Sequence, residues 1–344
     1  METKEHDGQM KVSLKAIAEK VGVTEAAVSM ALRNRGNISE KRKQQILQVA
    51  RELNYVPNLG ARSLSTGKSH LIGLVTATSF VEVTAELIDH FEQNIRSHHY
   101  QMIGSFHQGL QELEEKNMRD LTGRRVDGVV GFPATKTKCT SWKILREAKI
   151  PFVIFNEKAP FPHNHVQIDF ENGAYQMVEH LIQTGRRKLA FICTAFNAPS
   201  IQARLKGWRK ACDKYGLDFN ALPMFSSTAS GHNELLQDLA AKLVSCSRSI
   251  DGIAAANDML AIAVLQALSC RGIRVPEDIG VIGFDDSRVA SILPCPLSSV
   301  RQPLVKAANH ATEILLHHIE NPNTKFEHIV LKPELIPRET TRVV

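Results

Sequence analysis

The chain has 344 residues, of which 43% are hydrophobic, and carries a formal net charge of +6 at neutral pH. Its length exceeds that of one ordinary domain, so we expect two or three structural units. The sequence has no apolar leader at its N-terminus and no uncharged apolar stretch of roughly 18 residues, the length that crosses a bilayer. We therefore expect a cytoplasmic protein that makes no membrane contact.

Positive charge is concentrated in the first seventy residues. Residues 10–69 contain eleven Lys or Arg and four Asp or Glu, a balance of +7, so the rest of the chain is close to neutral. A basic segment attracts the phosphate backbone of nucleic acid through Coulomb forces and the release of bound counterions. A merely solvated basic face would have the same balance, so charge alone does not decide between the two.

The apolar spacing in residues 10–57 predicts three short helices. Ser13 can cap a helix that ends at Gly22, a residue that tolerates the left-handed conformation. Thr24 can then cap a second helix over about residues 25–32, after a tight turn. A third helix is expected from a cap at Ser39 to about residue 53, where it covers the first two. This is the spacing of a helix-turn-helix, although an ordinary antiparallel helix pair remains an alternative.

The outer side of the second helix is the candidate DNA-reading surface. Glu25 could accept a hydrogen bond from a cytosine amino group, Ala26 could contact a thymine methyl, and Ser29 could reach a phosphate or a base. Met30 and Arg33 lie on the same side. We therefore expect sequence to be read from this face.

From residue 69 onward, short apolar runs alternate with amphipathic helical stretches. The runs are LIGLV, QMIGS, DGVVGF, PFVIFN, LAFIC, DGIAAA and IGVIGF. Runs that are apolar on both faces are typical of parallel strands covered by helices on both sides. The pattern predicts doubly wound sheets, whose ligands bind beyond the carboxyl ends of the strands.

Several ordered motifs resemble the lac repressor family of bacterial regulators (LacI/GalR). They are LKAIAEKVGVTEAAVSMALRN, NYVPNLGARSLSTGKS, HLIQTGRRKLAFI, ARLKGWRKA, AANDMLAIAVLQAL and VPEDIGVIGFDD, which together span nearly the whole chain. The resemblance implies a small all-α helix-turn-helix headpiece over 10–57, a hinge helix over 58–68 and a ligand-sensing and dimerisation domain over 69–344. That domain would be periplasmic-binding-protein-like, with two doubly wound parallel-sheet lobes between which the chain crosses three times. The N-lobe is expected at about 70–168 and 300–328, and the C-lobe at about 169–299 and 329–344.

The resemblance also assigns roles in DNA binding. The leucine aligned with Leu64 wedges between base pairs in the minor groove of the family's operators, which unstacks a base step and bends the duplex. An ordinary linker leucine is the alternative. Many members have an arginine where Met30 stands, and methionine cannot donate to guanine, so we expect a changed operator. The expected DNA-contacting residues are Ser13, Thr24, Glu25, Ala26, Ser29, Met30, Arg33, Asn58, Ala61 and Leu64.

For the effector, the resemblance implies that Arg204 clamps oxygen atoms, that Asn257 offers an amide and that Asp285 accepts hydrogen bonds from hydroxyls. Asn156 would stand at another cleft position. The loop after the first strand adds Thr78, Ser79 and Phe80. Each role has a structural alternative: Asp285 could be a helix cap, Asn156 a turn residue and Arg204 an exposed salt-bridge partner. Such groups suit a sugar, a sugar derivative or a purine.

The expected function is that of a sequence-specific DNA-binding transcriptional regulator, a repressor that binds a pseudo-palindromic operator as a homodimer. The alternative is a solute-binding protein of a transport or signalling system, which leaves the basic headpiece unexplained. We expect no enzyme activity, cofactor or metal, since His163 and His165 flank an expected loop with no third ligand placed by spacing. The identity of the effector, and the choice between induction and corepression, stay open.

Overall fold

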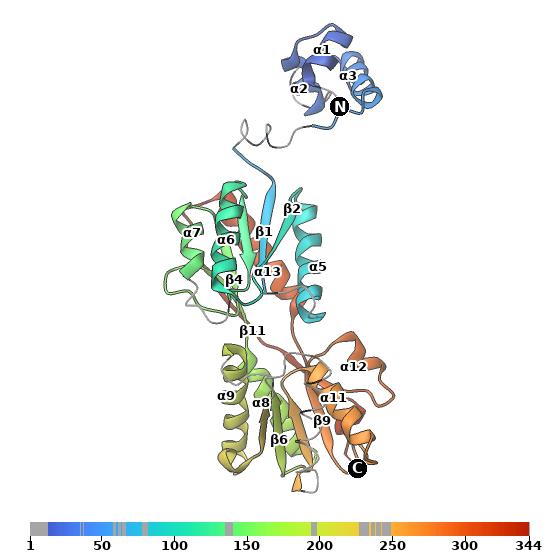
Figure 1. The fold of residues 1–344 in the computed structure, drawn as a ribbon, viewed down its shortest axis with the longest axis vertical. Coiled ribbons are helices and arrows are strands. Elements are labelled where there is room, and N and C mark those ends of the chain that lie inside the picture. Colours follow the sequence, from blue (N-terminus) through green and yellow to red (C-terminus); the bar gives the residue numbers. More distant parts are fainter. Residues whose placement is uncertain are drawn as a thin grey trace, which may run out of the picture. The chain divides into compact units, whose positions relative to one another are not determined.

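The computed structural model describes residues 13–34, 36, 38–57, 60, 63, 67–77, 82–134, 140–193, 198–226, 234, 238, 242 and 249–343. The chain forms two compact units, residues 1–69 and residues 70–344 (Figure 1). In the portion that is described, none of the helices combines the length and the apolar character needed to span a membrane.

The first unit contains the three expected helices, α1 (Leu14–Val21), α2 (Glu25–Leu32) and α3 (Glu40–Glu52). The Oγ atom of Ser13 accepts a hydrogen bond from the N–H of Ala16 at 3.3 Å, and Thr24 caps α2 in the same way. Gly22 ends α1 with a φ of 71°, as expected for a left-handed C-cap. Ser39 is the N-cap residue of α3, as expected, but its side chain makes no capping hydrogen bond.

The apolar faces of the three helices meet in one small core. Ile17, Val28 and Ile46, one from each helix, are completely buried and pack in the same cluster. Burying a side chain of this size contributes about 1.5–3 kcal/mol, so these contacts fix the angles between the helices. The core thus determines which side of α2 faces outward.

In the second unit, the first of two sheets has the strand order β11-β5-β4-β3-β1-β2, and all of its pairs are parallel. Its strands are β1 (Leu71–Thr76), β2 (Gln101–Phe106), β3 (Gly128–Gly131), β4 (Phe152–Phe155), β5 (Asn164–Ile168) and β11 (His328–Leu331). The helices around it are α5 (Glu82–Ser97), α6 (Gln111–Gly123), α7 (Lys143–Glu147) and α13 (Leu304–Glu320), with a 3-10 turn at Thr140–Trp142. This sheet and its helices form the first lobe.

The second sheet repeats the arrangement, with the order β12-β10-β9-β8-β6-β7, and only β12 runs antiparallel to its neighbour. Its strands are β6 (Leu189–Cys193), β7 (Met224–Ser226), β8 (Gly252–Ala255), β9 (Gly280–Asp285), β10 (Ser298–Arg301) and β12 (Glu334–Ile336). Its helices are α8 (Phe170–Gln183), α9 (Pro199–Lys214), α11 (Asp258–Ser269) and α12 (Arg288–Ile292), with 3-10 turns at Phe219–Ala221 and Glu339–Thr341. The predicted fold class of two doubly wound lobes is confirmed.

Within the described residues the chain passes between the lobes after β5, after β10 and after β11. Each passage starts at the carboxyl end of a strand, so the carboxyl edges of both sheets lie at the boundary between the lobes (Figure 1). The boundaries expected at about 299 and 328 fall inside β10 and β11. The lobes therefore change after Arg301 and Leu331, a few residues later than expected, because each of these strands completes its sheet before the chain leaves.

Candidate functional site

The outward face of α2 has the residues expected for DNA reading. Glu25, Ala26 and Arg33 are exposed, the Met30 side chain is 41% exposed, and Ser29 is half-buried. The Nε of Arg33 donates to the Oγ of Ser29 at 3.1 Å, so these two side chains lie together along the helix. The face thus combines a carboxylate, a thioether and a guanidinium that the headpiece core does not use.

Ser13 and Thr24 stand at the starts of α1 and α2. The hydroxyl oxygen of each accepts a backbone N–H from the first turn of its helix. A hydroxyl that accepts in this way keeps its own O–H as a donor. Both residues therefore define the helix starts and still have a hydrogen for a phosphate oxygen.

Six of the expected site residues lie outside the described part of the chain. They are Asn58, Ala61 and Leu64 in the expected hinge and Thr78, Ser79 and Phe80 in the loop after β1.

Arg204 lies in α9 and is buried between two aromatic rings. Its guanidinium carbon is 4.4 Å from the ring centre of Phe170 and 4.2 Å from that of Phe284. Burial lowers the pKa of Arg204 to about 10, while the nearby charge of Asp285 acts in the opposite direction. The group stays charged at neutral pH, and its Nε has no hydrogen-bond partner among the residues that are described. The alternative of an exposed salt-bridge partner is therefore wrong.

The position of Arg204 follows from the close packing of α9 on α8. A Cβ added to Gly207, one turn after Arg204, would lie 2.0 Å from the backbone oxygen of Glu171 in α8. Only glycine allows the two helix backbones to approach so closely. This approach places Arg204 over Phe170, the first residue of α8 and the point where the chain enters the second lobe.

Asp285 ends β9 beside this guanidinium. Its Oδ1 accepts a hydrogen bond from the Nε2 of Gln302 at 2.6 Å. Gln302 directly follows β10, where the chain leaves for the first lobe, and sequence reasoning missed it. The segment before it, SSVR, has only one apolar residue, so the apolar runs that predict strands gave no signal for it. Arg204, Asp285 and Gln302 form one polar cluster, called here the effector cluster.

Asn257 and Asn156 both have structural roles. The Oδ1 of Asn257 caps α11 by accepting the N–H of Leu260 at 2.8 Å. Asn156 has a φ of 60° after β4, and its Oδ1 accepts the N–H of Ile168 at 3.0 Å. The amide NH2 of each side chain is then the group that could donate to a ligand.

Glu157, like Gln302, was not predicted from the sequence. It lies at the carboxyl edge of the first sheet. It directly follows Asn156, and burial raises the pKa of its carboxyl group to about 7. A carboxyl group with such a pKa exists in both protonation states near neutral pH. The first lobe therefore brings a titratable group to the lobe boundary.

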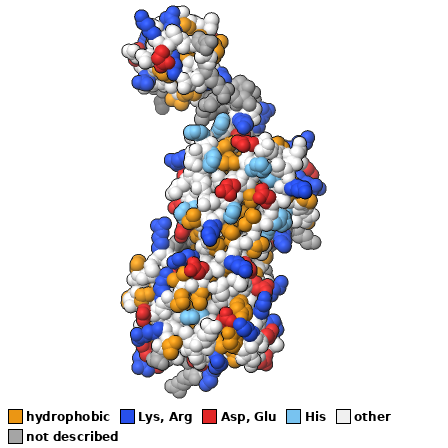
Figure 2. Space-filling view, turned by 180° about the vertical axis from the view of Figure 1, so that it is seen from behind, with side chains coloured by type: hydrophobic (Ala, Val, Ile, Leu, Met, Phe, Trp, Pro, Cys, Tyr) orange, Lys and Arg blue, Asp and Glu red, His pale blue; other side chains and the backbone are white. Residues whose placement is uncertain are grey.

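A cavity of about 630 Å³ lies elsewhere, against α13 and the segment that follows α5 in the first lobe. Its lining includes His98, Tyr100, His310 and His317, and none of the expected effector residues. Histidines gather on this lobe and are sparse on the other in Figure 2. The effector cluster, in contrast, lies at the strand ends, where ligands of doubly wound sheets bind.

His163 and His165, which were expected to flank a loop, are both buried. They are 3% and 1% exposed, and His165 lies within β5. His328 of β11 pairs with His165, and the three ring centres are 5.5 to 5.7 Å apart. Over the described ranges, however, no group of three His, Cys, Asp or Glu side chains is arranged to hold a metal ion.

Two family descriptions match the chain. "Bacterial regulatory proteins, lacI family" matches residues 13–58, and "Periplasmic binding protein-like domain" matches residues 178–341. The chain is 30% identical over 338 residues to the probable HTH-type transcriptional repressor ExuR of Bacillus subtilis, covering 96% of this chain and 98% of the relative. It is 26% identical over 336 residues to the HTH-type transcriptional repressor PurR of Haemophilus influenzae, covering 96% and 99%.

Solved structures have the same fold. The lac repressor dimer bound to operator and the anti-inducer ONPF superimposes with a TM-score of 0.85 at 22% identity, covering 96% of this chain and 99% of that chain. A complex of the transcriptional regulator CelR with cellobiose gives a TM-score of 0.69 at 25% identity, with the same coverage.

Proposed function

Because the chain belongs to the lacI family of bacterial regulatory proteins, we propose that it is a transcriptional repressor whose affinity for operator DNA is set by a small effector. The observation that supports DNA binding is the outward face of α2 on a basic headpiece. The effector cluster supports the sensing part, because a buried guanidinium with an unpartnered Nε can bind a ligand oxygen.

We propose that the protein acts as a homodimer in the cytoplasm, where its operator DNA is. Two headpieces related by a two-fold axis would read the two halves of a pseudo-palindrome in successive major grooves. The hinge, residues 58–68, would bind the minor groove between them, with Leu64 as the wedge. We propose no catalytic role for the effector cluster and no cofactor, since its groups bind and orient a ligand.

The proposed effector is a sugar, a sugar derivative or a purine that binds at the lobe boundary. A guanidinium fork, a carboxylate and amide groups fix the orientation of a molecule rich in hydroxyls or ring nitrogens. A ligand that contacts Asn156 on one lobe and Arg204 on the other would favour one arrangement of the lobes. Its binding is then coupled to DNA affinity, and by linkage DNA changes the ligand affinity by the same factor.

Selection of bound sequences from a random DNA library tests the DNA-binding part directly. We expect a two-fold-related motif, because the proposed dimer has that symmetry. The Met30→Arg variant should shift one base in each half-site toward guanine, since arginine donates two hydrogen bonds to guanine and methionine donates none. A library that returns no preferred sequence for either protein would refute the proposal.

Leu64→Ala tests the proposed wedge. Loss of the apolar side chain should weaken operator binding by about tenfold or more and leave binding to random DNA nearly unchanged, because only the bent operator contains the opened base step. Fluorescence anisotropy with both DNAs measures the two affinities. Val56→Ala, at an exposed position between α3 and the hinge, is the matched control. Equal losses on both DNAs would show that Leu64 is not a wedge.

A further inference from the structure

The turn that follows β9, residues 285–287, has an unusual backbone. Asp285 has a φ of 125° and Asp286 a φ of 55°. Aspartate tolerates the left-handed region in which Asp286 lies, but the conformation of Asp285 is one that side chains with a Cβ rarely adopt. Such a conformation persists only where surrounding contacts hold it. Contacts to turn 285–287 are therefore part of what shapes the effector cluster.

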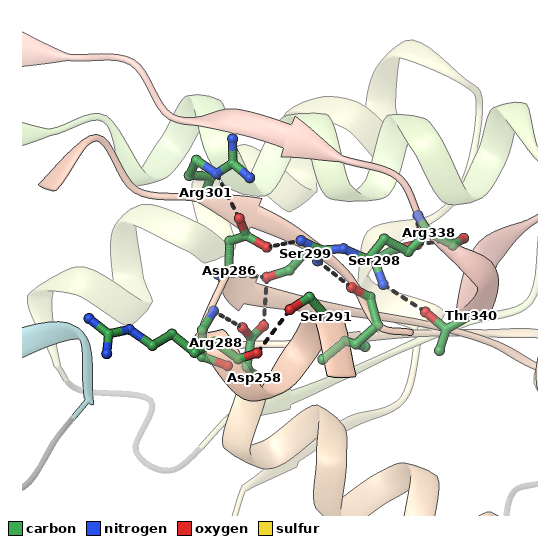
Figure 3. A network of polar contacts seen from close by, with 11 residues as sticks. Asp258, Asp286, Arg288, Ser291, Ser298, Ser299, Arg301, Arg338 and Thr340 are labelled. Carbon is green, nitrogen blue, oxygen red and sulfur yellow. Dashed lines mark hydrogen bonds and ion pairs between the residues drawn. The ribbon is translucent and has the colours of Figure 1, made fainter. Parts of the chain in front are cut away.

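Asp258, at the start of α11, connects to both N–H groups that follow Asp285. Its Oδ2 accepts the N–H of Ser287 at 2.7 Å, and its Oδ1 accepts the Oγ–H of Ser299 at 2.6 Å. The same Ser299 oxygen accepts the N–H of Asp286 at 3.0 Å. One carboxylate thus fixes two consecutive peptide groups, directly and through one hydroxyl (Figure 3).

The surroundings of Asp258 are built to contain a carboxylate. The residue is 1% exposed, and a Cβ added to Gly283 would lie 2.2 Å from its Oδ1. Burial raises the pKa of Asp258 to about 6, and within the described ranges neither a lysine nor an arginine pairs with it. A carboxylate is costly to bury without a basic partner, and its place beside a binding cluster favours a functional role.

Asp286 holds the turn from its other side. Its carboxylate accepts hydrogen bonds from the Nε of Arg301 at 2.6 Å and from a guanidinium nitrogen of Arg338 at 2.5 Å. Figure 3 shows Asp286 between these arginines and Asp258 beneath the turn. Arg301 ends β10 and Arg338 follows β12. These two ion pairs therefore connect turn 285–287 to segments that adjoin two of the lobe crossings.

We propose that Asp258 is a positioning residue of the effector cluster, whose carboxylate holds turn 285–287 in the conformation that presents Asp285 to the ligand beside Arg204. This inference rests on the proposed function, since it takes Asp285 and Arg204 as effector-binding residues. Asp258 touches no ligand itself and acts through Ser287 and Ser299. Because it directly follows Asn257, it also joins that expected effector residue to Asp285.

Crystal structures of the full-length wild type, Asp258→Asn and Ser299→Ala test the positioning step without a ligand. The uncharged amide of Asp258→Asn can accept through only one of its two ends, so either the N–H of Ser287 or the hydroxyl of Ser299 loses its acceptor. We expect Asp285 to relax to a negative φ and its bond to Gln302 to break. Ser299→Ala leaves the bond between Asp258 and Ser287 in place and serves if Asp258→Asn does not fold. An unchanged φ at Asp285 in the variants that fold would overturn the proposal.

Calorimetric titration with D-ribose, cellobiose, D-glucuronate and hypoxanthine supplies the binding readout. For any of these probes that binds the wild type, we expect Asp258→Asn to raise the dissociation constant by about tenfold or more. Asp278→Asn is the matched control, because Asp278 pairs with Arg274 at the surface of the same lobe. It should change neither the affinity nor the conformation of Asp285.

Arg204→Met separates this inference from the proposed function. If Arg204→Met abolishes probe binding and Asp258→Asn does not change it, the positioning role is wrong and the effector cluster stands. If neither variant changes probe binding, the assignment of the effector cluster is wrong. In that case, and also if none of the four probes binds, the φ of Asp285 in the crystal structures tests whether Asp258 holds the turn.

Discussion

Arg204→Met is expected to abolish the response of DNA binding to effector while the protein remains folded and bound to its operator. The guanidinium is the one cation of the effector cluster, and methionine fills a similar volume between Phe170 and Phe284 without a donor. Loss of a charge-assisted hydrogen bond to a ligand in such a buried site should weaken effector binding by about a hundredfold. The headpiece residues are unaffected by this change.

The stability of Arg204→Met should be close to that of the wild type or higher. A pKa lowered from 12.5 to about 10 corresponds to a cost of about 3 kcal/mol for keeping the buried cation, present at every pH below 10. The lost cation–π contacts, about 0.5–2 kcal/mol each, offset this gain. Functional sites often carry such a cost. Thermal denaturation of the free protein measures the balance.

Arg209→Met is the matched control, because Arg209 lies on the same helix and stacks over Phe219 at 4.2 Å, outside the effector cluster. A panel of sugars, sugar phosphates and purines, screened by thermal shift, identifies compounds that bind the wild type. Operator binding is then measured with and without each active compound. A normal response in Arg204→Met would move the clamp to another residue.

Glu114→Ala should strongly destabilise the larger unit. Glu114 lies in α6, is completely buried and accepts three hydrogen bonds, from the N–H of Ala134 at 2.8 Å, the Nε1 of Trp142 at 3.0 Å and the Oγ of Ser141 at 2.6 Å. Removing the carboxylate takes away the acceptor that these three buried donors share. We expect a loss of about 3–5 kcal/mol in the free energy of unfolding.

In a domain of this size, that loss corresponds to a fall in melting temperature of about 10 °C. Circular dichroism during heating measures it, with Glu112→Ala, an exposed position on the same helix, as the control. Glu114→Gln should lie between the two, since its amide keeps the shape and one acceptor. Equal melting temperatures for Glu114→Ala and Glu112→Ala would show that the three contacts contribute nothing.

The headpiece was predictable because its signals are local. Ser13, Gly22 and Thr24 lie within twelve residues of each other and define the end of one helix and the starts of two. The exception is Ser39, whose side chain makes no capping bond although its sequence context resembles the other two caps. Residue type indicates which groups can cap a helix, and the backbone geometry at that position decides whether they do.

The effector cluster was only partly predictable because its members come from distant parts of the chain. Arg204 and Asp285 were expected from the resemblance, whereas Gln302 became visible only when β9 and β10 were placed side by side. The same limit applied to His328, which pairs with His165 across two parallel strands. Spacing along the sequence gives no measure of such contacts.

The three crossings also constrain how the polypeptide can mature during synthesis. The first lobe begins at residue 71, but its sheet and helix layer lack α13 and β11 until Leu331 has been made. α13 covers the first sheet with fully buried Ala307, Ala311 and Leu315, so a nascent chain that stops earlier leaves that surface open to water. Neither lobe can therefore close before β11 and β12 have been synthesised, and both should become protease-resistant together.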